Sequence, residues 1–470
     1  MVRSDDELMD CLAFELAPRP PSMFDAFSLR KTNKAVLVSV LETFVPCEAV
    51  VPDGCRFVVE GGYLLHVLVW SQPATFGETL YEAYATYVKR FYGNTAVVVF
   101  DGYDATSTST KIVEQNRRQK KNTCSDINFN DIMTVSTSQA SFLENARNKS
   151  RLIESLSQHL KREGINVKQS AADDDVLIVN TAFDLSKTED FIAVVGQDTD
   201  LLVLLVVLNS TDRDVVFLTA GQKQKPVKVY SSKKLQANLG DMCQVLLFMH
   251  DMSGCGTTSA LYRQSEEKTF KLLMQNDELH EVAAVFNNSA SSHDDVAKAG
   301  GTFLLALYGF STCDSLDRLR YFTYSSKVAH QNLQTEFNLG SLPPTTTAAR
   351  QYSFRVFHQI QQWLGLDLSP TDWGWYVTEG CLHPVSTDKQ LSPEHILKLI
   401  SCNCKSCCSR NCGCRKAGME CSNMCGQCRG ISCSNDKQFH DLDDDIHDDS
   451  DELISPETKN SQDEAGVYSD

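Results

Sequence analysis

Long apolar runs and an export signal are both missing from this sequence. No run reaches the roughly 18 residues that a membrane-spanning helix requires, and the longest candidate, residues 191–208, is interrupted by Gln197, Asp198 and Asp200. The opening residues, MVRSDDELMD, lack the basic and then apolar pattern of a secretory signal. We therefore expect neither a membrane partner nor an oxidising compartment.

Positive charge is also scarce, with 44 Lys and Arg against 61 Asp and Glu and a net charge of −17. The imbalance is concentrated at the C-terminus, because residues 435–470 carry thirteen acidic side chains against two basic ones, Lys437 and Lys459. The excess of acidic residues therefore predicts that residues 436–470 form a disordered acidic tail. We expect it to aid solubility; the alternatives are competition with nucleic acid for basic surfaces and contact with chromatin or protein partners.

At 470 residues and 42% hydrophobic composition, the chain is long enough for two or three globular units. Composition and pattern predict a helical N-terminal region, an α/β domain, a helical extension, a Cys-rich zinc domain and the acidic tail. Their expected bounds are 1–50, 51–290, 291–400, 401–435 and 436–470. We assign no chemistry to the N-terminal region.

Cysteines are concentrated in one short stretch, where ten of the eighteen lie between Cys402 and Cys433. Such density indicates either a disulfide knot or a zinc–thiolate cluster. Because no oxidising compartment is expected and basic residues lie among the thiols, zinc is favoured. The predicted ligands are Cys402, Cys404, Cys407, Cys408, Cys412, Cys414, Cys421, Cys425, Cys428 and Cys433. The basic residues are Lys405, Arg410, Arg415, Lys416 and Arg429.

This stretch has C-x-C, a second C-x-C after a basic spacer, and then C-x6-C-x3-C, and it resembles the tesmin-type CXC domain of DNA-binding and chromatin proteins. The resemblance implies about three zinc ions shared by nine cysteines, with Cys407 or Cys408 as the spare. It also implies DNA contacts by the basic residues and a nuclear location. Asn411 stands where that family often has a tyrosine, and Cys425-x2-Cys428 replaces a C-x-C. A structural zinc knot without DNA contacts is the alternative.

Strand and helix patterns alternate through residues 51–290. The segments 56–70, 96–104, 165–182 and 191–205 each begin with a short apolar strand. Residues 141–164 predict an amphipathic helix. This alternation predicts a parallel α/β sheet flanked by helices.

Acidic residues follow three of these strands, and the carboxyl ends of parallel strands share one edge of a sheet. The acids concerned are Glu60, Asp101, Asp104, Asp198 and Asp200. Carboxylates gathered at one edge suit Mg²⁺ or Mn²⁺, and two such ions can support phosphodiester cleavage. The alternative is that each acid only caps a helix or ends a strand.

The segments VVEGGYLLH, VVVFDGYD and VVGQDTDLLVLL resemble the flap-endonuclease superfamily of PIN-like nucleases, over roughly residues 50–290. The resemblance implies a catalytic metal site formed by Glu60, Asp101, Asp173, Asp175, Asp198 and Asp200. Three positions depart from the family: Glu60 replaces Asp, Ala171 replaces Glu and Gly256 replaces Asp. Losing the last two carboxylates would weaken the second metal site most.

More narrowly, the chain resembles a family of invertebrate proteins, often linked to mobile elements, that pair the nuclease-like domain with a CXC unit. Segments 342–365 and 372–377 carry this closer resemblance but suggest no chemistry. Their tryptophans, Trp363, Trp373 and Trp375, are expected to pack in the core rather than stack on bases.

A basic element follows the second strand, where the resembled nucleases have a helical arch over single-stranded DNA. Its residues are Lys111, Arg117, Arg118, Lys120 and Lys121. No aromatic residues alternate with these charges, which favours phosphate contact over base stacking. A solvated helix face explains them equally well.

Two functions follow from these features. The favoured one is a non-catalytic or weakly active DNA-binding protein that keeps a degenerate nuclease-like domain and a zinc module. The alternative is an active Mg²⁺- or Mn²⁺-dependent structure-specific nuclease. The eight cysteines outside the cluster are expected to be buried apolar residues.

Overall fold

The computed structural model describes residues 5–25, 28–48, 50–70, 73–102, 110, 124–170, 174–219, 227–310, 313–330, 337–378, 380–394 and 396. In the Cys-rich region it describes residues 402, 404, 408, 412–416, 421, 425, 428 and 435. The chain divides into two compact units, Met1–Pro393 and Glu394–Asp470. The finer division into five parts remains a prediction.

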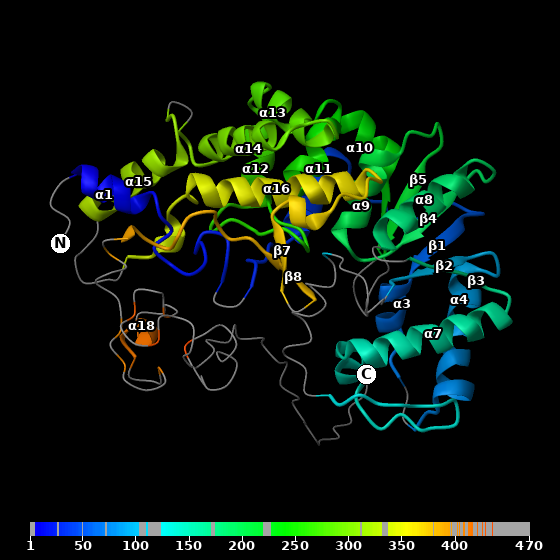
Figure 1. Ribbon diagram of the computed structural model, residues 1–470. Helices are drawn as coiled ribbons and strands as arrows, with labels where there is room; N and C mark the ends of the chain where they lie inside the picture. The colour runs from blue at the N-terminus through cyan, green and yellow to red at the C-terminus, as the bar shows by residue number, and fades with distance from the viewer. Residues whose placement is uncertain are drawn as a thin grey trace, which may run out of the picture. The chain divides into compact units, whose positions relative to one another are not determined.

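The first unit contains a six-stranded sheet, which lies on the right in Figure 1. The strands, in spatial order, are β3 (Asn166–Gln169), β2 (Val97–Phe100), β1 (Arg56–Glu60), β4 (Ile192–Val195), β5 (Val215–Thr219) and β6 (Lys228–Ser231). The first five are parallel and β6 is antiparallel to β5. Sequences such as VVVF and IAVV suit this position because strands buried on both faces are almost wholly apolar.

Successive side chains of the strands enter two different cores, one on each face of the sheet. The smaller core contains Val59 and Val98 with residues of α3 (Gly61–Val67), α4 (Glu82–Tyr92) and α7 (Ala146–Arg162). The larger core contains Val58 and Val97 and residues of the helices on the other face. These begin with α2 (Ala35–Phe44), α8 (Asp174–Ser186), α9 (Thr199–Leu208), α10 (Ser232–Leu239) and α11 (Met242–Met252). The sheet therefore lies between two helical layers.

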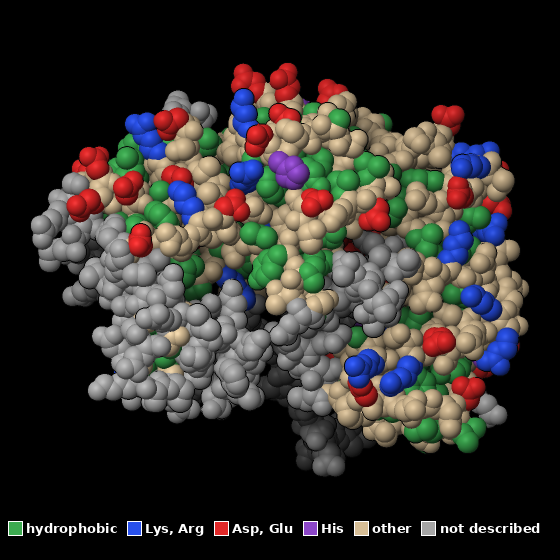
Figure 2. Space-filling view, viewed as in Figure 1, with side chains coloured by type: hydrophobic (Ala, Val, Ile, Leu, Met, Phe, Trp, Pro, Cys, Tyr) green, Lys and Arg blue, Asp and Glu red, His purple; other side chains and the backbone are tan. Residues whose placement is uncertain are grey.

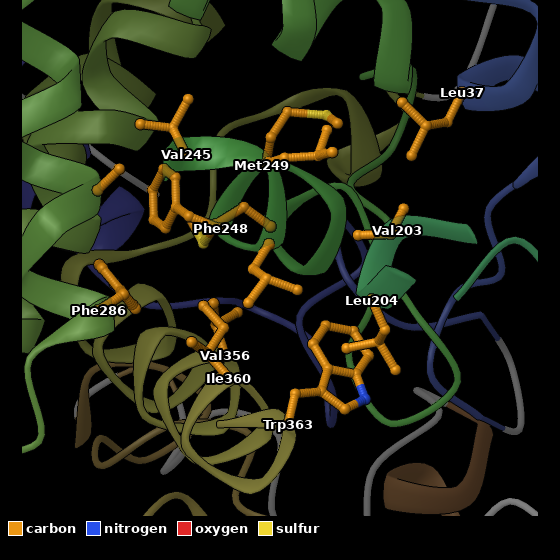
Figure 3. Close-up of a cluster of buried hydrophobic side chains, with 14 of the residues drawn as sticks. Leu37, Val203, Leu204, Val245, Phe248, Met249, Phe286, Val356, Ile360 and Trp363 are labelled. Atoms are coloured by element: carbon orange, nitrogen blue, oxygen red, sulfur yellow. The ribbon is translucent and has the colours of Figure 1, made fainter. Parts of the chain in front are cut away.

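Helices beyond the sheet extend the larger core. They are α12 (Glu266–Met274), α13 (Glu278–Asn287), α14 (His293–Leu307), α15 (Leu316–His330) and α16 (Thr346–Trp363). Figure 3 shows Phe248 of α11 packed among Phe286 of α13 and Val356 of α16, with Trp363 beside Leu204 of α9. This packing holds α9 and α11, which carry the polar residues described below.

The remaining described elements are small. They are α1 (Asp5–Leu12), the π-helix η1 (Phe76–Tyr81), α6 (Gln139–Glu144), two 3₁₀ turns (Leu339–Ser341 and Pro370–Asp372), the hairpin of β7 (Trp375–Thr378) and β8 (Cys381–Pro384), and α18 (Gly413–Lys416). Among the described helices, none is long and apolar enough to span a membrane.

The predicted parallel α/β architecture is confirmed by this sheet. The single helix predicted over 141–164 is two helices, because Asn145 caps the start of α7 by accepting hydrogen bonds from the backbone N–H groups of Arg147 and Asn148. Trp363, Trp373 and Trp375 are buried, as predicted. Among the scattered cysteines, Cys11 is buried, as expected, and Cys381 is exposed, which the expectation missed. The other six are partly buried, and five of them pack against the hydrophobic cores: Cys47, Cys55, Cys243, Cys255 and Cys313.

Candidate functional site

A lysine bridges the two acidic side chains that follow β4. Asp198 is the N-cap of α9, and its Oδ1 accepts a hydrogen bond from the Asp200 backbone N–H. Lys34 Nζ, at the N-terminal end of α2, donates to Asp200 Oδ2 at 2.7 Å and to Asp198 Oδ1 at 3.2 Å. Burial alone would lower the pKa of Lys34, but the carboxylates of Asp200 and Asp198 outweigh burial and hold this pKa well above its usual value. The protein thus supplies its own cation to this acidic pair.

The other oxygen of Asp200 is held by a histidine. His250 Nε2, in α11, lies 2.7 Å from Asp200 Oδ1, and its Nδ1 lies 3.4 Å from Glu266 Oε1, an ion-pair distance. Glu266 Oε2 accepts a hydrogen bond from the backbone N–H of Leu37 at 3.1 Å. The Trp363 ring stacks on His250 with the centroids 5.9 Å apart. Contacts therefore run from α2 through α9, α11 and α12 back to α2, and we call this set the Lys34 circuit.

This circuit occupies both carboxylate oxygens of Asp200. Mg²⁺ binds carboxylate oxygens at about 2.0–2.1 Å, so an ion on Oδ2 would lie close to the Lys34 ammonium, 2.7 Å from the same atom, and the two positive charges would repel each other. Burial alone would raise the pKa of Asp200, but Lys34 and His250 outweigh burial and hold this pKa well below its usual value. The arrangement therefore disfavours a divalent ion at Asp200 while Lys34 stays in place.

His250 is expected to make the protein less stable at alkaline pH. Burial lowers the pKa of this imidazole, but hydrogen bonds with Asp200 and Glu266 outweigh burial and raise it to about 9. Because the unfolded value is about 6.5, this stabilisation is complete below that pH and is lost as the pH rises towards 9. We expect the free energy of unfolding to fall by on the order of 2–3 kcal/mol across this window.

Urea unfolding between these pH values would measure the loss. His250→Gln cannot carry the charge, so its stability should vary much less over the same window. An equally steep decline in the variant would show that other groups cause it.

A buried acid follows His250 and lies beside the loop that contains Gly256. Asp251 Oδ1 accepts hydrogen bonds from Thr258 Oγ1 at 2.6 Å and from Cys255 Sγ at 3.0 Å. Burial raises the pKa of Asp251 to about 7. The Asp251 carboxylate is therefore directed into the protein, where it accepts hydrogen bonds from the loop that contains Gly256. Gly256 is the position at which the resembled nucleases have a metal-facing Asp.

The predicted acids on the neighbouring strands lie at one edge of the sheet, as expected. Glu60 ends β1 and Asp101 follows β2, and the two strands are adjacent. Glu60 Oε2 accepts a hydrogen bond from the Gln197 backbone N–H at 3.2 Å, one residue before Asp198. Within the described part of the chain, however, no three of the predicted carboxylates bring their oxygens within 4.8 Å of one another.

Of the remaining predicted acids, Asp104 lies outside the described residues, and the others belong to the segment before and at the start of α8. Asp175 lies in the first turn of that helix. Asp173 and the departure at Ala171 lie outside the described residues. The described carboxylates therefore share an edge without forming a compact cluster.

Gly196 allows Glu60 to approach the backbone after β4. A Cβ atom at this position would lie 2.7 Å from Glu60 Oε2 and 2.8 Å from Leu201 Cδ1. We expect Gly196→Ala to displace Glu60 and to lower the free energy of unfolding by about 1–3 kcal/mol. Gly301→Ala in α14 is the control, because a Cβ there meets nothing within 4 Å. Thermal unfolding that shows equal losses in both variants would contradict this role of Gly196.

The thiols of the second unit converge into two overlapping groups of four. Within each group all the sulfur atoms lie within 4.8 Å of one another. One group is Cys402, Cys408, Cys412 and Cys421, and the other is Cys402, Cys421, Cys425 and Cys428. Cys402 and Cys421 belong to both, which is the arrangement expected of bridging ligands. The predicted ligands Cys407 and Cys433 lie outside the described residues.

The spacing of these sulfur atoms fits a metal rather than disulfides. Sγ–Sγ distances are 3.7 Å for Cys402–Cys408, 3.8 Å for Cys402–Cys421, 3.7 Å for Cys412–Cys421 and 3.5 Å for Cys414–Cys425. A disulfide would require about 2.05 Å. Four sulfurs placed tetrahedrally at about 2.3 Å from zinc lie about 3.8 Å apart. The spacings of the described thiols are therefore close to those of a zinc–thiolate cluster.

Most of the predicted DNA-contacting residues lie outside the described parts of the chain. These are Lys111, Arg117, Arg118, Lys120, Lys121, Lys405, Arg410 and Arg429. Arg415 and Lys416 are described, in the last turn of α18 directly after Cys414. On the face of the molecule seen in Figure 2, the described Lys and Arg side chains are interspersed with Asp and Glu.

The residues that complete the Lys34 circuit could not be identified from the sequence. Lys34 belongs to the N-terminal region, to which no chemistry was assigned, and it lies 166 positions from Asp200. His250 offered one usable signal, because a His-Asp pair follows the apolar run VLLFM in the helix MCQVLLFMHDM. Polar residues inside such a helix are normally paired with other buried groups.

No protein-family model matches the sequence, and no curated protein matches it. Among solved structures, the catalytic core of Rad2 in complex with DNA substrate is 12% identical, with a TM-score of 0.36 over 72% of this chain and 100% of that one. Human GEN1 in complex with Holliday junction DNA is 13% identical, with a TM-score of 0.37 over 75% and 86%. The T5 D15 protein co-crystallised with metal ions is 11% identical, with a TM-score of 0.32 over 65% and 88%.

Similarity at these identities and scores assigns neither a family nor an activity to this chain. The α/β architecture is established by the order and direction of its own strands.

Proposed function

We propose that this chain is a DNA-associated, zinc-binding protein whose nuclease-like domain is a non-catalytic or weakly active platform. The Lys34 ammonium between Asp198 and Asp200 is the observation that carries this proposal. Metal-dependent phosphodiester cleavage needs cations that polarise the attacking and leaving oxygens. An ammonium held by two carboxylates compensates their charge but has no open coordination position for a water or a phosphate.

The zinc module would be a tesmin-type CXC unit that holds about three ions. Two thiol groups that share Cys402 and Cys421 support bridging, and Cys414 lies 3.5 Å from Cys425, adjacent to the second group. Zinc would supply folding energy to this small unit rather than catalysis.

Arg415 and Lys416 follow the thiol Cys414 directly and suit contacts with DNA phosphates. A nuclear location, an origin from a mobile element and protein contacts through the acidic tail belong to the same proposal and rest on the sequence resemblance.

Incubation of the full chain with flap, nicked and single-stranded DNA tests the proposal. We expect no cleavage above background in Mg²⁺ or Mn²⁺, together with DNA binding that weakens steeply as salt rises. Wild-type cleavage that requires Mg²⁺ or Mn²⁺ and disappears in Asp198→Ala would establish the alternative, an active nuclease.

Binding is tested separately with zinc-loaded protein. The double variant Arg415→Ala, Lys416→Ala should bind more weakly and with a smaller salt dependence, the logarithmic slope falling by about 0.9 for each phosphate that is no longer neutralised. Lys187→Ala, which removes an exposed, ion-paired lysine directly after α8, is the control. Equal binding by all three proteins would show that Arg415 and Lys416 do not bind DNA.

A further inference from the structure

Two helices of the smaller core bring together a second set of metal-binding side chains. We propose that Glu82, His159 and Glu163 form a zinc site, named here the His159 cluster. One donor atom from each residue lies within 4.8 Å of the other two. His159 and Glu163 are four positions apart at the C-terminal end of α7, so they share one face of the helix. Glu82 begins α4, which packs against α7.

The geometry of His159 and Glu82 suits a shared cation. His159 Nε2 lies 3.4 Å from Glu82 Oε2, beyond the usual hydrogen-bond range of about 2.7–3.2 Å. Two ligand atoms placed tetrahedrally at about 2.0–2.1 Å from zinc would be about 3.4 Å apart. His159 Nε2 is shielded from solvent and has no hydrogen-bond partner among the described residues, although buried polar atoms normally have one. A zinc ion would provide that partner.

Neighbouring residues hold the ligands in this orientation. Thr86 Oγ1 donates to Glu82 Oε1 at 3.4 Å, which leaves Oε2 directed towards His159. The Tyr81 ring packs against the imidazole with the centroids 5.8 Å apart. Tyr81 also ends the π-helix η1 directly before α4, and π-helical turns are frequent at functional sites. Support of this kind is typical of the residues that surround metal ligands.

The chemistry of the donors selects the metal. One imidazole nitrogen and two carboxylates are a set that zinc accepts, with water as the fourth ligand. Mg²⁺ and Ca²⁺ prefer oxygen ligands alone, so they should bind much more weakly.

Lys89 competes with the metal for one ligand. Its Nζ lies 2.6 Å from Glu163 Oε2, and both side chains are about one-third exposed. Zinc binding requires Glu163 to exchange this ammonium for the ion. Removing the ammonium should therefore strengthen zinc binding, whereas the same change in a purely structural ion pair would leave zinc binding unaffected.

The experiment uses the full chain after its cysteine region has been saturated with zinc, and measures further zinc uptake by equilibrium dialysis at neutral pH. We expect one additional ion per chain. Glu82→Gln and His159→Gln should abolish this uptake, and Lys89→Met should tighten it by roughly fivefold, the value of an exposed ion pair. Glu154→Gln, on the exposed face of the same helix α7, should bind like the wild type.

A second measurement separates loss of binding from loss of folding. Added zinc should raise the thermal unfolding temperature of the wild type and of Lys89→Met, but not that of folded Glu82→Gln. No additional ion in the wild type, uptake that survives in Glu82→Gln, or Mg²⁺ binding in place of zinc would each overturn the proposal.

Discussion

Lys34→Met is expected to lower the free energy of unfolding of the first unit by about 3 kcal/mol. The variant leaves the carboxylates of Asp198 and Asp200 next to each other without the ammonium that bridges them. Breaking a buried ion pair by removing one partner costs about 3–5 kcal/mol, and we take the lower value because the Asp198 side chain is 42% exposed. Chemical denaturation of the full chain, followed by tryptophan fluorescence, measures the change.

Lys31→Met is the matched control, because Lys31 is exposed and lies three positions earlier on the same segment. A change within about 0.5 kcal/mol is expected there.

Adding a metal ion to Lys34→Met shows whether the variant is less stable because it lacks the positive charge or because it lacks the packing of the lysine side chain. Millimolar Mn²⁺ should restore part of the stability of Lys34→Met, since a divalent ion can then reach Asp198 and Asp200, and should leave the wild type unchanged. If Lys34→Met is as stable as the control, Lys34 does not compensate these carboxylates in solution.

Cys421→Ser is expected to remove most of the zinc from the second unit. Its sulfur belongs to both thiol groups, so one substitution breaks two tetrahedral sites. We expect about three zinc ions in the cysteine region of the wild type and at most one in that of Cys421→Ser. Structural zinc in small peptides contributes about 10–16 kcal/mol of binding energy, so loss of folded structure in this unit should accompany loss of the metal.

Cys408→Ser provides an internal comparison because Cys408 belongs to one group only. It should lose fewer ions than Cys421→Ser, while Cys381→Ser, an exposed thiol in the hairpin of the first unit, should lose none. Elemental analysis of the purified proteins gives the three values. Equal zinc contents for Cys408→Ser and Cys421→Ser would contradict the shared role of Cys421.

The parallel part of the sheet could be predicted from the sequence because short strand patterns alternate with helical ones; β5 and β6, which follow each other with no described helix between them, were not predicted. The same alternation predicted that Glu60, Asp101 and Asp198 would lie at one edge, since parallel strands all end on the same side. The thiol cluster was equally predictable, because cysteines this close along the chain cannot be far apart in space.

The partners of the acids could not be predicted in the same way. Lys34 reaches Asp200 only because α2 packs beside α9, and no local pattern encodes a contact between residues 166 positions apart. Glu266 reaches α2 across 229 positions. A strand-end carboxylate facing a metal and one facing a distant lysine look alike in sequence, so the ion pairs of Asp198 and Asp200 with Lys34 could not be foreseen.

The Lys34 circuit also affects the order in which the chain can fold during synthesis. Lys34 leaves the ribosome 166 residues before Asp200, an interval of roughly 10–30 s at 5–20 residues per second. The hydrogen bond from the Leu37 backbone N–H to Glu266 can form only later, because Glu266 follows Leu37 by 229 residues. Contacts of such high sequence separation form late and slowly. The N-terminal helix α2 can therefore begin to pack only when α9 and α10 have been made, and its packing is complete only after α12. Nascent chains that end before residue 266 should therefore be more exposed to chaperones and proteases than the full chain.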